Sequence, residues 1–345
     1  NSGSSANLIA LTALKEYYKM PDGSEVIIPA TTFATVAMPI IQIGLVPVYV
    51  DIDLDTLNIK VDEINLAITK KTKIIMPVHT LGLPANMKEI NKIANKNNLI
   101  VFEDCCEAHG ASIKNKKVGS FGQISAFSFF VAHNITTGEG GMILTNNKKL
   151  MEICKSLREF GRINQNISNK NKRFITIKKL KKYDRKYIFE RLGYNMRMTD
   201  IAGSLGVEQT KKLDFLNKQR VNNAKYLIKK FKFKNLFNFQ IIYKNYFHSY
   251  YGFSFTIINK KINRYKLLNF LEKNEIETRP MFAGCLPDQP AFKNTPGRSV
   301  GKLKNSRVIK DNSFFIGIHP KLNKSDLEYI LKVFNNFIKN LKISF

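Results

Sequence analysis

Short, nearly continuous apolar runs alternate with amphipathic helical patterns through the first half of the chain, and this alternation constrains the fold most strongly. The apolar runs predict strands over residues 25–30, 46–53, 73–80 and 99–104. The helical patterns between them cover residues 33–44, 61–70 and 86–98. Strands without polar alternation are buried on both faces, so the pattern predicts a mostly parallel α/β sheet covered by helices. Ligands bind such sheets beyond the carboxyl ends of the strands.

The second half of the chain has a different pattern. A strand pattern at 250–257 is surrounded by helical patterns over 211–231, 264–274 and 324–341, which predicts a smaller α+β unit. A chain of 345 residues is long enough for one large and one smaller domain. We therefore expect a large α/β domain over residues 1–210 and a C-terminal α+β domain over 211–345. The lysine- and asparagine-rich stretch 163–186 is expected to be an exposed excursion.

The chain is strongly basic, with 55 Lys and Arg against 27 Asp and Glu and a net charge of +28. Such an excess can mark nucleic-acid binding. Here the lysines are scattered over the whole chain among asparagines and isoleucines, without a helix-turn-helix, zinc-finger or RNA-binding signature. We therefore attribute the charge to compositional bias and expect no nucleic-acid partner.

Neither a membrane span nor a metal site is predicted. No apolar run reaches the roughly 18 residues that a span requires, and no leader with a cleavage site is present. The four cysteines lack metal-ligand spacing, which is typical of free thiols in a cytoplasmic protein. The chain begins "NSGSSANLIALTAL", without methionine and within the pattern of a functional loop, so we expect a further N-terminal segment before it.

Three segments contain candidate site residues. Gly3 and Ser4 open a helix whose free amides suit a phosphate, although serine-rich helix starts are commonly N-caps. Glu103 and Asp104 end an apolar strand, where a carboxylate can pair with a protonated heterocyclic nitrogen or cap the next helix.

The third segment is "SFFVAHNITTGEGGMILTNN", from 128 to 147. Its "GEGG" allows a turn with positive φ and close approach to another group. Ser128 is a candidate phosphate ligand, and His133 follows a small residue on the turn. A single histidine is commonly structural, but this setting favours a catalytic role.

Several ordered motifs resemble those of the DegT/DnrJ/EryC1/StrS aminotransferase family, and together they extend over nearly the whole chain. They are "NSGSSAN", "IPATTFATVAMPIIQIGLVPVYVDID", "PVHTLGLPANM", "FEDCCEAHGA", "FSFFVAHNITTGEGGMILTNN", "GYNMRMTDIAGSLGVEQ" and "ETRPMFAG". The resemblance implies a fold-type-I enzyme that uses pyridoxal 5'-phosphate (PLP) or pyridoxamine 5'-phosphate (PMP) and acts on nucleotide-linked keto-sugars.

The resemblance also implies roles for individual residues. In the cofactor site, Gly3, Ser4 and Ser128 would hold the phosphate, Phe33 would stack on the pyridine ring, Asp104 would pair with the ring nitrogen and Glu107 would lie near the ring hydroxyl. Asn195 matches an asparagine that reaches the phosphate from the other subunit, which implies a homodimer.

His133 is the departure from the common family pattern, because most members have at this position the lysine that forms a Schiff base with the cofactor. No lysine occurs from Val118 to Asn147 that could replace it. The same histidine characterises the nucleotide-sugar 3-dehydratases of the family, which the "AHNITTGEGG" and "ETRPMFAG" segments resemble. That branch commonly has a second histidine where this chain has Asn134.

Membership of this branch implies a lyase that removes the C3 hydroxyl of a nucleotide-linked 4-keto-6-deoxyhexose, such as GDP-4-keto-6-deoxymannose. His133 would act as the general base and then the general acid, and L-glutamate would regenerate PMP. The product would enter deoxysugar biosynthesis for a surface polysaccharide such as the lipopolysaccharide O-antigen. Arg162 and Arg279 are candidate contacts for pyrophosphate or glutamate, and we expect His248 and His319 to be structural.

Three other interpretations of the sequence differ from this one in the cofactor or in the activity. A related subgroup holds an iron–sulfur cluster on cysteines after an R-x-x-G-R motif, but "REFGRINQNISNKNKRF" contains no cysteine, so we expect no cluster. The chain could instead be a sugar aminotransferase with a degenerate lysine site. It could also be a non-catalytic protein that binds a sugar or a cofactor.

Overall fold

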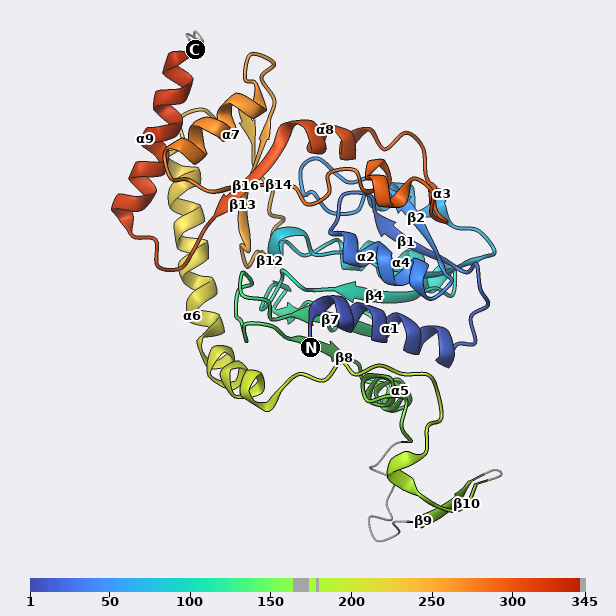
Figure 1. The fold of residues 1–345 in the computed structure, drawn as a ribbon. Helices are drawn as coiled ribbons and strands as arrows, with labels where there is room; N and C mark the ends of the chain where they lie inside the picture. The colour runs from blue at the N-terminus through green and yellow to red at the C-terminus, as the bar shows by residue number, and fades with distance from the viewer. Residues whose placement is uncertain (164–173, 178–179, 342–345) are drawn as a thin grey trace.

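The largest sheet of the molecule has seven strands in the order β15-β2-β1-β3-β4-β7-β8. The computed structural model describes residues 1–163, 174–177 and 180–341, and Figure 1 shows its ribbon. The strands of this sheet are β1 (Glu25–Pro29), β2 (Val46–Val50), β3 (Thr72–Ile75), β4 (Ile100–Asp104), β7 (Ile124–Ser128), β8 (Gly141–Leu144) and β15 (Arg298–Ser299). All neighbours are parallel except β7 and β8. The mostly parallel sheet predicted from the apolar runs is therefore present.

Helices cover both faces of this sheet. One face packs against α1 (Gly3–Tyr17), α2 (Ala34–Gln42) and α5 (Lys148–Arg158), and the other against α3 (Val61–Ala67) and α4 (Met87–Lys96). Within β1, Val26 and Ile28 join the cluster of the first face, whereas Ile27 joins that of the second. Because successive side chains point to opposite faces of a strand, both sets must be apolar, which explains the continuous runs.

A second sheet lies in the C-terminal half and is antiparallel, in the order β11-β13-β16-β14. Its strands are β11 (Phe237–Asn238), β13 (Gly252–Ile257), β14 (Thr278–Pro280) and β16 (Ser313–Gly317). The helices of this half are α6 (Asp200–Lys230), α7 (Arg264–Lys273), α8 (Lys304–Asn312) and α9 (Lys324–Asn340). Stacked rings of Phe255, Phe314 and Phe334 form the centre of this core. Figure 1 shows α9 beside α6 along the outer side of this unit.

The C-terminal half also returns to the large sheet. β15 pairs in parallel with β2, and the guanidinium of Arg298 donates to both carboxylate oxygens of Glu25, at 2.7 and 2.8 Å. These bonds hold the pKa of Glu25 at about 2, well below its usual value. The predicted domain division between residues 210 and 211 falls inside α6, which begins at Asp200 and not at 211.

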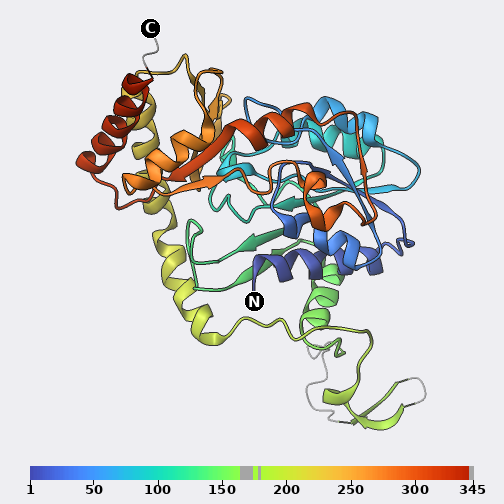
Figure 2. The same ribbon diagram turned by 45° about the horizontal axis from the view of Figure 1, so that its top comes forward.

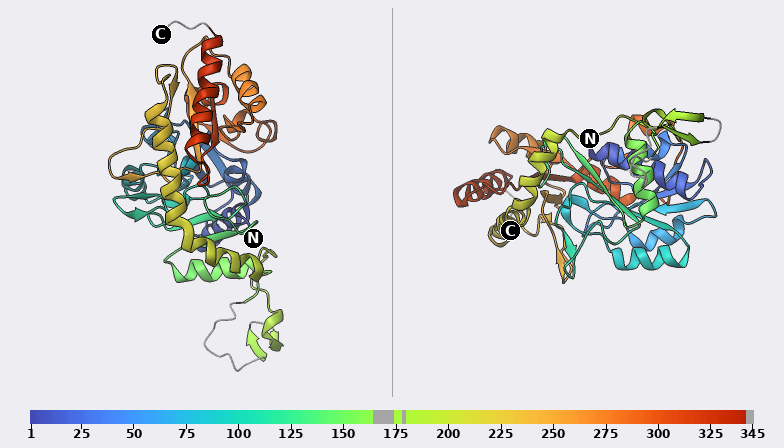
Figure 3. Two further views of the ribbon diagram at one scale, coloured as in Figure 1. Left: turned by 90° about the vertical axis from the view of Figure 1, so that its left-hand side faces the viewer. Right: turned by 90° about the horizontal axis from the view of Figure 1, so that it is seen from below.

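Two short sheets complete the described structure. β12 (Tyr246–Phe247), β5 (Ser112–Ile113) and β6 (Lys116–Lys117) form one of them, so residues from both halves share a sheet. The other is the hairpin of β9 (Phe174–Ile177) and β10 (Leu180–Asp184), which projects beyond α5 in Figures 1, 2 and 3. The hairpin belongs to the predicted excursion 163–186, of which residues 164–173 and 178–179 lie outside the described residues.

Across the described ranges, none of the helices combines the length and the apolar character needed to cross a membrane. All four cysteines lie in these ranges and are free; Cys105, Cys154 and Cys285 are buried.

Candidate active site

The predicted site residues gather where the parallel strands of the large sheet end. Phe33 follows β1 at the start of α2, Asp104 is the last residue of β4, and Ser128 is the last residue of β7. Because these strands are parallel, their carboxyl ends lie along one edge of the sheet. The fold thereby brings together residues that are nearly 100 positions apart in the sequence.

A close backbone contact joins the start of α1 to the end of β7. A Cβ atom on Gly3 would lie 2.6 Å from Cβ and 3.0 Å from Oγ of Ser128, and 3.0 Å from Sγ of Cys106. Only glycine leaves room for this approach. The hydroxyl of Ser2 caps the helix by accepting from the Ser5 amide, which leaves the first amides of α1 for a ligand. A phosphate group fits this arrangement of helix start and serine hydroxyl.

Asp104 is oriented by two hydrogen bonds beneath this helix start. Its Oδ2 accepts from the side-chain amide of Asn7 at 2.9 Å, and its Oδ1 accepts from the Cys106 amide at 3.0 Å. The carboxyl group is almost fully buried, as is Asn7. A fixed, buried carboxylate suits a protonated ring nitrogen, because an opposite charge offsets the cost of burying it. Asn7 was not among the predicted site residues.

The neighbouring acid, Glu103, has a structural role on the other face of the strand. Its oxygens accept from the amides of Gly119, Phe121 and Gly122, at 2.6 to 2.8 Å. His79 accepts from the Ala85 amide through Nδ1, so its Nε2 carries the proton and donates to Glu103 at 3.1 Å. Each oxygen of Glu103 accepts two hydrogen bonds, whereas each oxygen of Asp104 accepts one, so Asp104 is the strand-end acid with capacity left for a ligand.

Glu107 lies close to Asp104 and is held by one hydrogen bond, from the Leu81 amide at 2.8 Å. Burial, with a smaller contribution from the Asp104 charge, raises the pKa of Glu107 to about 8, although the Leu81 amide acts in the opposite direction. The carboxyl group is therefore mostly protonated at neutral pH. In that form it can donate a hydrogen bond to an oxygen of a ligand.

His133 lies on the loop after β7 with its ring among other aromatic side chains. The ring centroid is 5.2 Å from that of Tyr251, 6.1 Å from that of His109 and 6.2 Å from that of Phe130. Its Nδ1 is buried without a hydrogen-bond partner. Burial lowers the pKa of His133 to about 4, and the nearby Arg220 guanidinium acts in the same direction. The imidazole is thus neutral at physiological pH and able to accept a proton.

Asn134, the departure from the dehydratase pattern, is buried. Its side-chain amide donates to Asn217 Oδ1 at 3.0 Å and to the Ser249 carbonyl at 2.9 Å. Asn217 in turn donates to the His109 carbonyl at 2.7 Å. These bonds tie the His133 loop to α6 and to the segment before β13, so Asn134 fixes the backbone that carries His133.

The remaining predicted residues lie on or near the surface. Phe33 is 59% exposed, and Ser4 and Asn195 are also exposed. Asn195 is adjacent to Met196, whose carbonyl accepts from the Asn1 amino group at 2.9 Å. Arg162 pairs with Glu159, and Arg279 pairs with Glu277.

Sequence reasoning missed three residues of the site: the buried Asn7 and Arg220 and the partly buried Tyr251. Asn7 could have been found as a polar residue on the apolar face of the first helix. Arg220 gives a similar signal within α6, because it falls among the buried positions Asn217, Asn223, Ala224 and Leu227. Nothing in the local sequence distinguishes Tyr251 from Tyr250.

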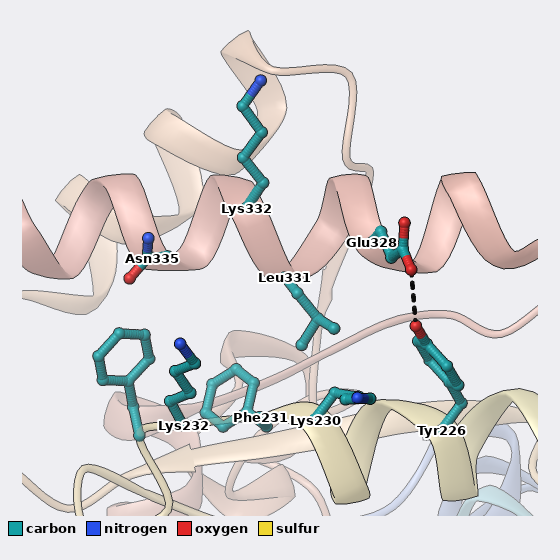
Figure 4. A pocket seen from close by; sticks show the side chains of 9 residues that line it. Tyr226, Lys230, Phe231, Lys232, Glu328, Leu331, Lys332 and Asn335 are labelled. Carbon is teal, nitrogen blue, oxygen red and sulfur yellow. Dashed lines mark hydrogen bonds between the residues drawn. The ribbon is translucent and has the colours of Figure 1, made fainter.

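A groove on the outer side of the small unit contains none of the predicted site residues. Figure 4 shows it between α6 and α9, with Lys230 and Lys332 at its edges. Glu328 accepts from the Tyr226 hydroxyl at 2.9 Å there.

Comparison with known proteins agrees with this geometry. The sequence signature of the DegT/DnrJ/EryC1/StrS aminotransferase family matches residues 1–335. The chain belongs to this family. The lipopolysaccharide biosynthesis protein RfbH of Salmonella typhimurium is 39% identical over 348 residues, covering 97% of this chain and 80% of that protein.

Other members of the family named by their activity are almost as similar. GDP-4-keto-6-deoxy-D-mannose 3-dehydratase of Escherichia coli O55:H7 is 34% identical, covering 96% of this chain and 86% of that enzyme. GDP-perosamine synthase of Escherichia coli O157:H7 is 36% identical, covering 98% of this chain and 84% of that enzyme. Both a dehydratase and a synthase are thus among the relatives of this member of the family.

Solved structures confirm the fold. The crystal structure of GDP-4-keto-6-deoxymannose-3-dehydratase with a trapped PLP-glutamate geminal diamine matches with a TM-score of 0.87 at 32% identity, covering 96% of this chain and 86% of that one. The expectation of a fold-type-I PLP enzyme with a mixed, mostly parallel sheet is therefore confirmed.

Proposed function

We propose that the chain is a cytoplasmic 3-dehydratase of a nucleotide-linked 4-keto-6-deoxyhexose and that it uses PLP and PMP. The observation that carries this proposal is a neutral, partly buried His133 where most members of the family have the cofactor-binding lysine. No lysine occurs from 118 to 147 to replace it. Relatives named as GDP-4-keto-6-deoxy-D-mannose 3-dehydratases support GDP-4-keto-6-deoxymannose as the first substrate to test.

The residues at the strand ends fit the cofactor. Gly3, Ser4 and Ser128 would bind its phosphate at the start of α1. Asp104, oriented by Asn7, would accept a hydrogen bond from the protonated pyridine nitrogen. The ring of Phe33 is exposed and available for stacking, and protonated Glu107 would donate to the ring hydroxyl.

His133 would perform the proton transfers. The bound cofactor supplies an amine that condenses with the sugar ketone and a ring that takes up electrons. Neutral His133 can remove a proton from the carbon that bears this amine and then deliver it to the hydroxyl leaving from C3. A lysine in its place would compete for the cofactor through its own amine, so the histidine favours loss of water over transfer of nitrogen. L-Glutamate would restore the amine after each turnover, as the glutamate adduct in the related dehydratase crystal supports.

A second copy of the chain would complete the site. Large apolar side chains are exposed together between 187 and 207, with Leu192 97% and Ile201 79% exposed. The other members of this surface are Tyr187, Phe189, Leu205 and Val207. Monomeric proteins rarely leave such a surface in water, and Asn195 lies within it. We expect a homodimer in which Asn195 reaches the phosphate site of the partner.

Two other functions make different predictions. The similarity to GDP-perosamine synthase favours a sugar aminotransferase as the second candidate. An aminotransferase needs a lysine from elsewhere, so borohydride reduction would attach the cofactor covalently to the chain, whereas a dehydratase gives no adduct. A non-catalytic sugar- or cofactor-binding protein would be stabilised by its ligand but would release no ammonia.

The decisive assay incubates the protein with PLP, L-glutamate and a panel of GDP-, CDP- and dTDP-linked 4-keto-6-deoxyhexoses. We expect one of them to yield a 3-deoxy product and ammonia, and we expect His133→Lys to shift the products toward the 4-amino sugar. His133→Asn serves as the control that removes the base without adding an amine. Unchanged substrate across the whole panel would overturn the proposal.

A further inference from the structure

Arg220 is a buried cation that has no acidic partner among the described residues. Its side chain is 5% exposed, and it is the only Lys or Arg classed as buried among the described residues. One guanidinium nitrogen donates to the carbonyls of Tyr250 and Tyr251, both at a long 3.4 Å, and Nε has no partner. Burial lowers the pKa of Arg220 to about 10, so the group is still charged at neutral pH. A buried charge without a counter-charge is costly unless it serves a ligand.

This cation lies at the reacting end of the site. Besides burial, its positive charge lowers the pKa of His133. It also donates to the carbonyl of Tyr251, whose ring centroid is 5.2 Å from that of His133. One further polar atom beside it, Nδ1 of His133, is buried without a hydrogen-bond partner among the described residues. Nε of Arg220 on α6 and Nδ1 of His133 on the loop after β7 therefore both have unused hydrogen-bonding capacity, which is the pattern of a polar ligand site.

A carboxylate is the anion that fits this place. An α-amino acid carries its carboxylate on the same carbon that loses a proton when its amine is transferred. That carboxylate must therefore lie within a few ångströms of the base that moves the proton. The diphosphate of a nucleotide sugar lies beyond the hexose ring and cannot reach this end at the same time. The planar fork of an arginine also matches a carboxylate with two parallel hydrogen bonds.

We propose that Arg220 binds the α-carboxylate of the amino donor, an amino dicarboxylate such as L-glutamate, beside His133. The proposal rests on the dehydratase function above, since it assigns the donor step of that reaction. Against the effect of burial, the charge of Arg279 also acts to lower the pKa of Tyr251, but Arg279 is exposed and paired with Glu277. Arg279 is therefore available at the outer side of the site for the second carboxylate of the donor.

The donor step can be measured separately from dehydration. Protein loaded with PLP is mixed with L-glutamate, and the pyridoxal absorbance is followed as the cofactor is converted to PMP. Arg220→Gln should raise the glutamate concentration needed for half-maximal conversion by about 30-fold, the loss typical of a charged hydrogen bond. Calorimetric titration with glutarate, a dicarboxylate without an amine, should show the same weakening. Unaltered protein preloaded with PMP should dehydrate the sugar in a single turnover without glutamate, which measures the dehydration step apart from the donor step.

Controls separate binding from folding. Arg264→Gln removes a half-buried arginine on α7 that also donates to a carbonyl, that of Ser313 at 2.9 Å, and it should leave glutamate and glutarate binding unchanged. Arg220→Lys keeps the charge without the fork and should give an intermediate loss, about tenfold. The unaltered protein can also be tested with two amides of glutamate. Isoglutamine, in which the α-carboxylate is replaced by an amide, should convert PLP to PMP far more slowly than glutamine, in which the γ-carboxylate is replaced.

Two results would overturn the proposal. One is an unchanged glutamate and glutarate dependence in a folded, PLP-binding Arg220→Gln or Arg220→Lys protein. The other is an equal rate of PLP-to-PMP conversion by the unaltered protein with glutamine and with isoglutamine. If PMP-loaded protein dehydrates its sugar but glutamate never converts PLP, the donor assignment fails while the dehydratase function stands. If no sugar is dehydrated at all, the function itself fails.

Discussion

The imidazole of His133 lies beside the phenol of Tyr251, with ring centroids 5.2 Å apart and ring planes tilted by 34°. His133 comes from the loop after β7, and Tyr251 precedes β13 of the small sheet, so the contact joins the two halves of the fold. Burial raises the pKa of Tyr251 to about 12, which keeps its hydroxyl protonated. The general base His133 thus lies beside the neutral phenol of Tyr251 and near the Arg220 cation.

The first prediction is that His133 stays neutral down to acidic pH. Burial and the Arg220 charge place its pKa at about 4 in the cofactor-free chain, and proton NMR with His133→Gln for assignment should show this titration. The unfolded chain binds the proton near pH 6.5, so the free energy of unfolding should fall as pH drops from 7 to 5. His133→Gln should reduce that fall by about 2 kcal/mol. A His133 titration between pH 6 and 7 would contradict the account.

A second prediction concerns Glu107, whose pKa is raised to about 8 by burial. The folded state holds a proton that the unfolded state loses near pH 4.5, so this group costs stability as pH rises from 4.5 to 8. Glu107→Gln should therefore stabilise the cofactor-free protein at pH 8 by about 4 kcal/mol and have little effect at pH 4. Chemical denaturation at both pH values measures the difference. An equal effect at both would show that the carboxyl group is ionised at neutral pH.

Removing the partner of Asp104 should weaken cofactor binding. Asn7→Leu deletes the 2.9 Å hydrogen bond that orients Oδ2 of Asp104, and we expect the dissociation constant for PLP to rise about tenfold. Thr12→Ala on the same helix removes a hydroxyl that bonds only the Leu8 carbonyl, so its PLP affinity should not change. Absorbance titration gives both constants, and equal losses in the two variants would point to α1 stability instead of Asp104 orientation.

Gly3 should tolerate no side chain. In Gly3→Ala the new methyl group would lie 2.6 Å from Cβ of Ser128, which should destabilise the protein by about 1–3 kcal/mol and disrupt phosphate binding. Gly317→Ala at the end of β16 is the matched control, because its Cβ would meet no atom within 4 Å. There, the change should stabilise the strand by about 0.5–1 kcal/mol. Similar thermal stability and PLP affinity in both variants would contradict the proposed phosphate site at Gly3 and Ser128.

The exposed apolar surface predicts dimerisation. Leu192→Asp or Ile201→Asp should convert the homodimer to monomer and abolish turnover, as light scattering coupled to size exclusion would show. Tyr265→Asp on α7 changes a residue of similar exposure, 74%, outside this surface and should leave the dimer intact. A fully active monomer would show that Asn195 serves no partner site.

Local patterns predicted the elements whose environment is uniform along their length. Strands such as β1 are apolar on both faces, so the run of apolar residues and the strand nearly coincide. The start of α6 was predicted too late, because its first half, with Gly203 and Gly206, is exposed and shows little apolar periodicity. The two-residue strand β15 has no pattern of its own and exists only through its pairing with β2 and the bond from Arg298 to Glu25.

In the site, too, some residues could be predicted from local motifs, whereas others could be assigned only from their contacts in the structure. Gly3, Asp104, Ser128 and His133 stand in recognisable motifs, and the strand ends bring the first three together. The choice between Glu103 and Asp104 needed the structure, because only the alternation of side chains along β4 shows which carboxylate faces the turn at 119–122. Arg220 could not be assigned from its neighbours in sequence, since its meaning depends on the carbonyls of Tyr250 and Tyr251 and on the absence of an acid beside it among the described residues.

The most direct test of the account follows the nitrogen of the amino donor. Protein, PLP and the nucleotide-linked 4-keto-6-deoxyhexose are incubated with ¹⁵N-labelled L-glutamate, and the label is located by mass spectrometry. If His133 directs loss of the C3 hydroxyl, the label will appear in free ammonia and the sugar product will be a nitrogen-free 3-deoxy ketone. Label retained at C4 of the sugar, with the C3 hydroxyl intact, would contradict the dehydratase function and identify an aminotransferase.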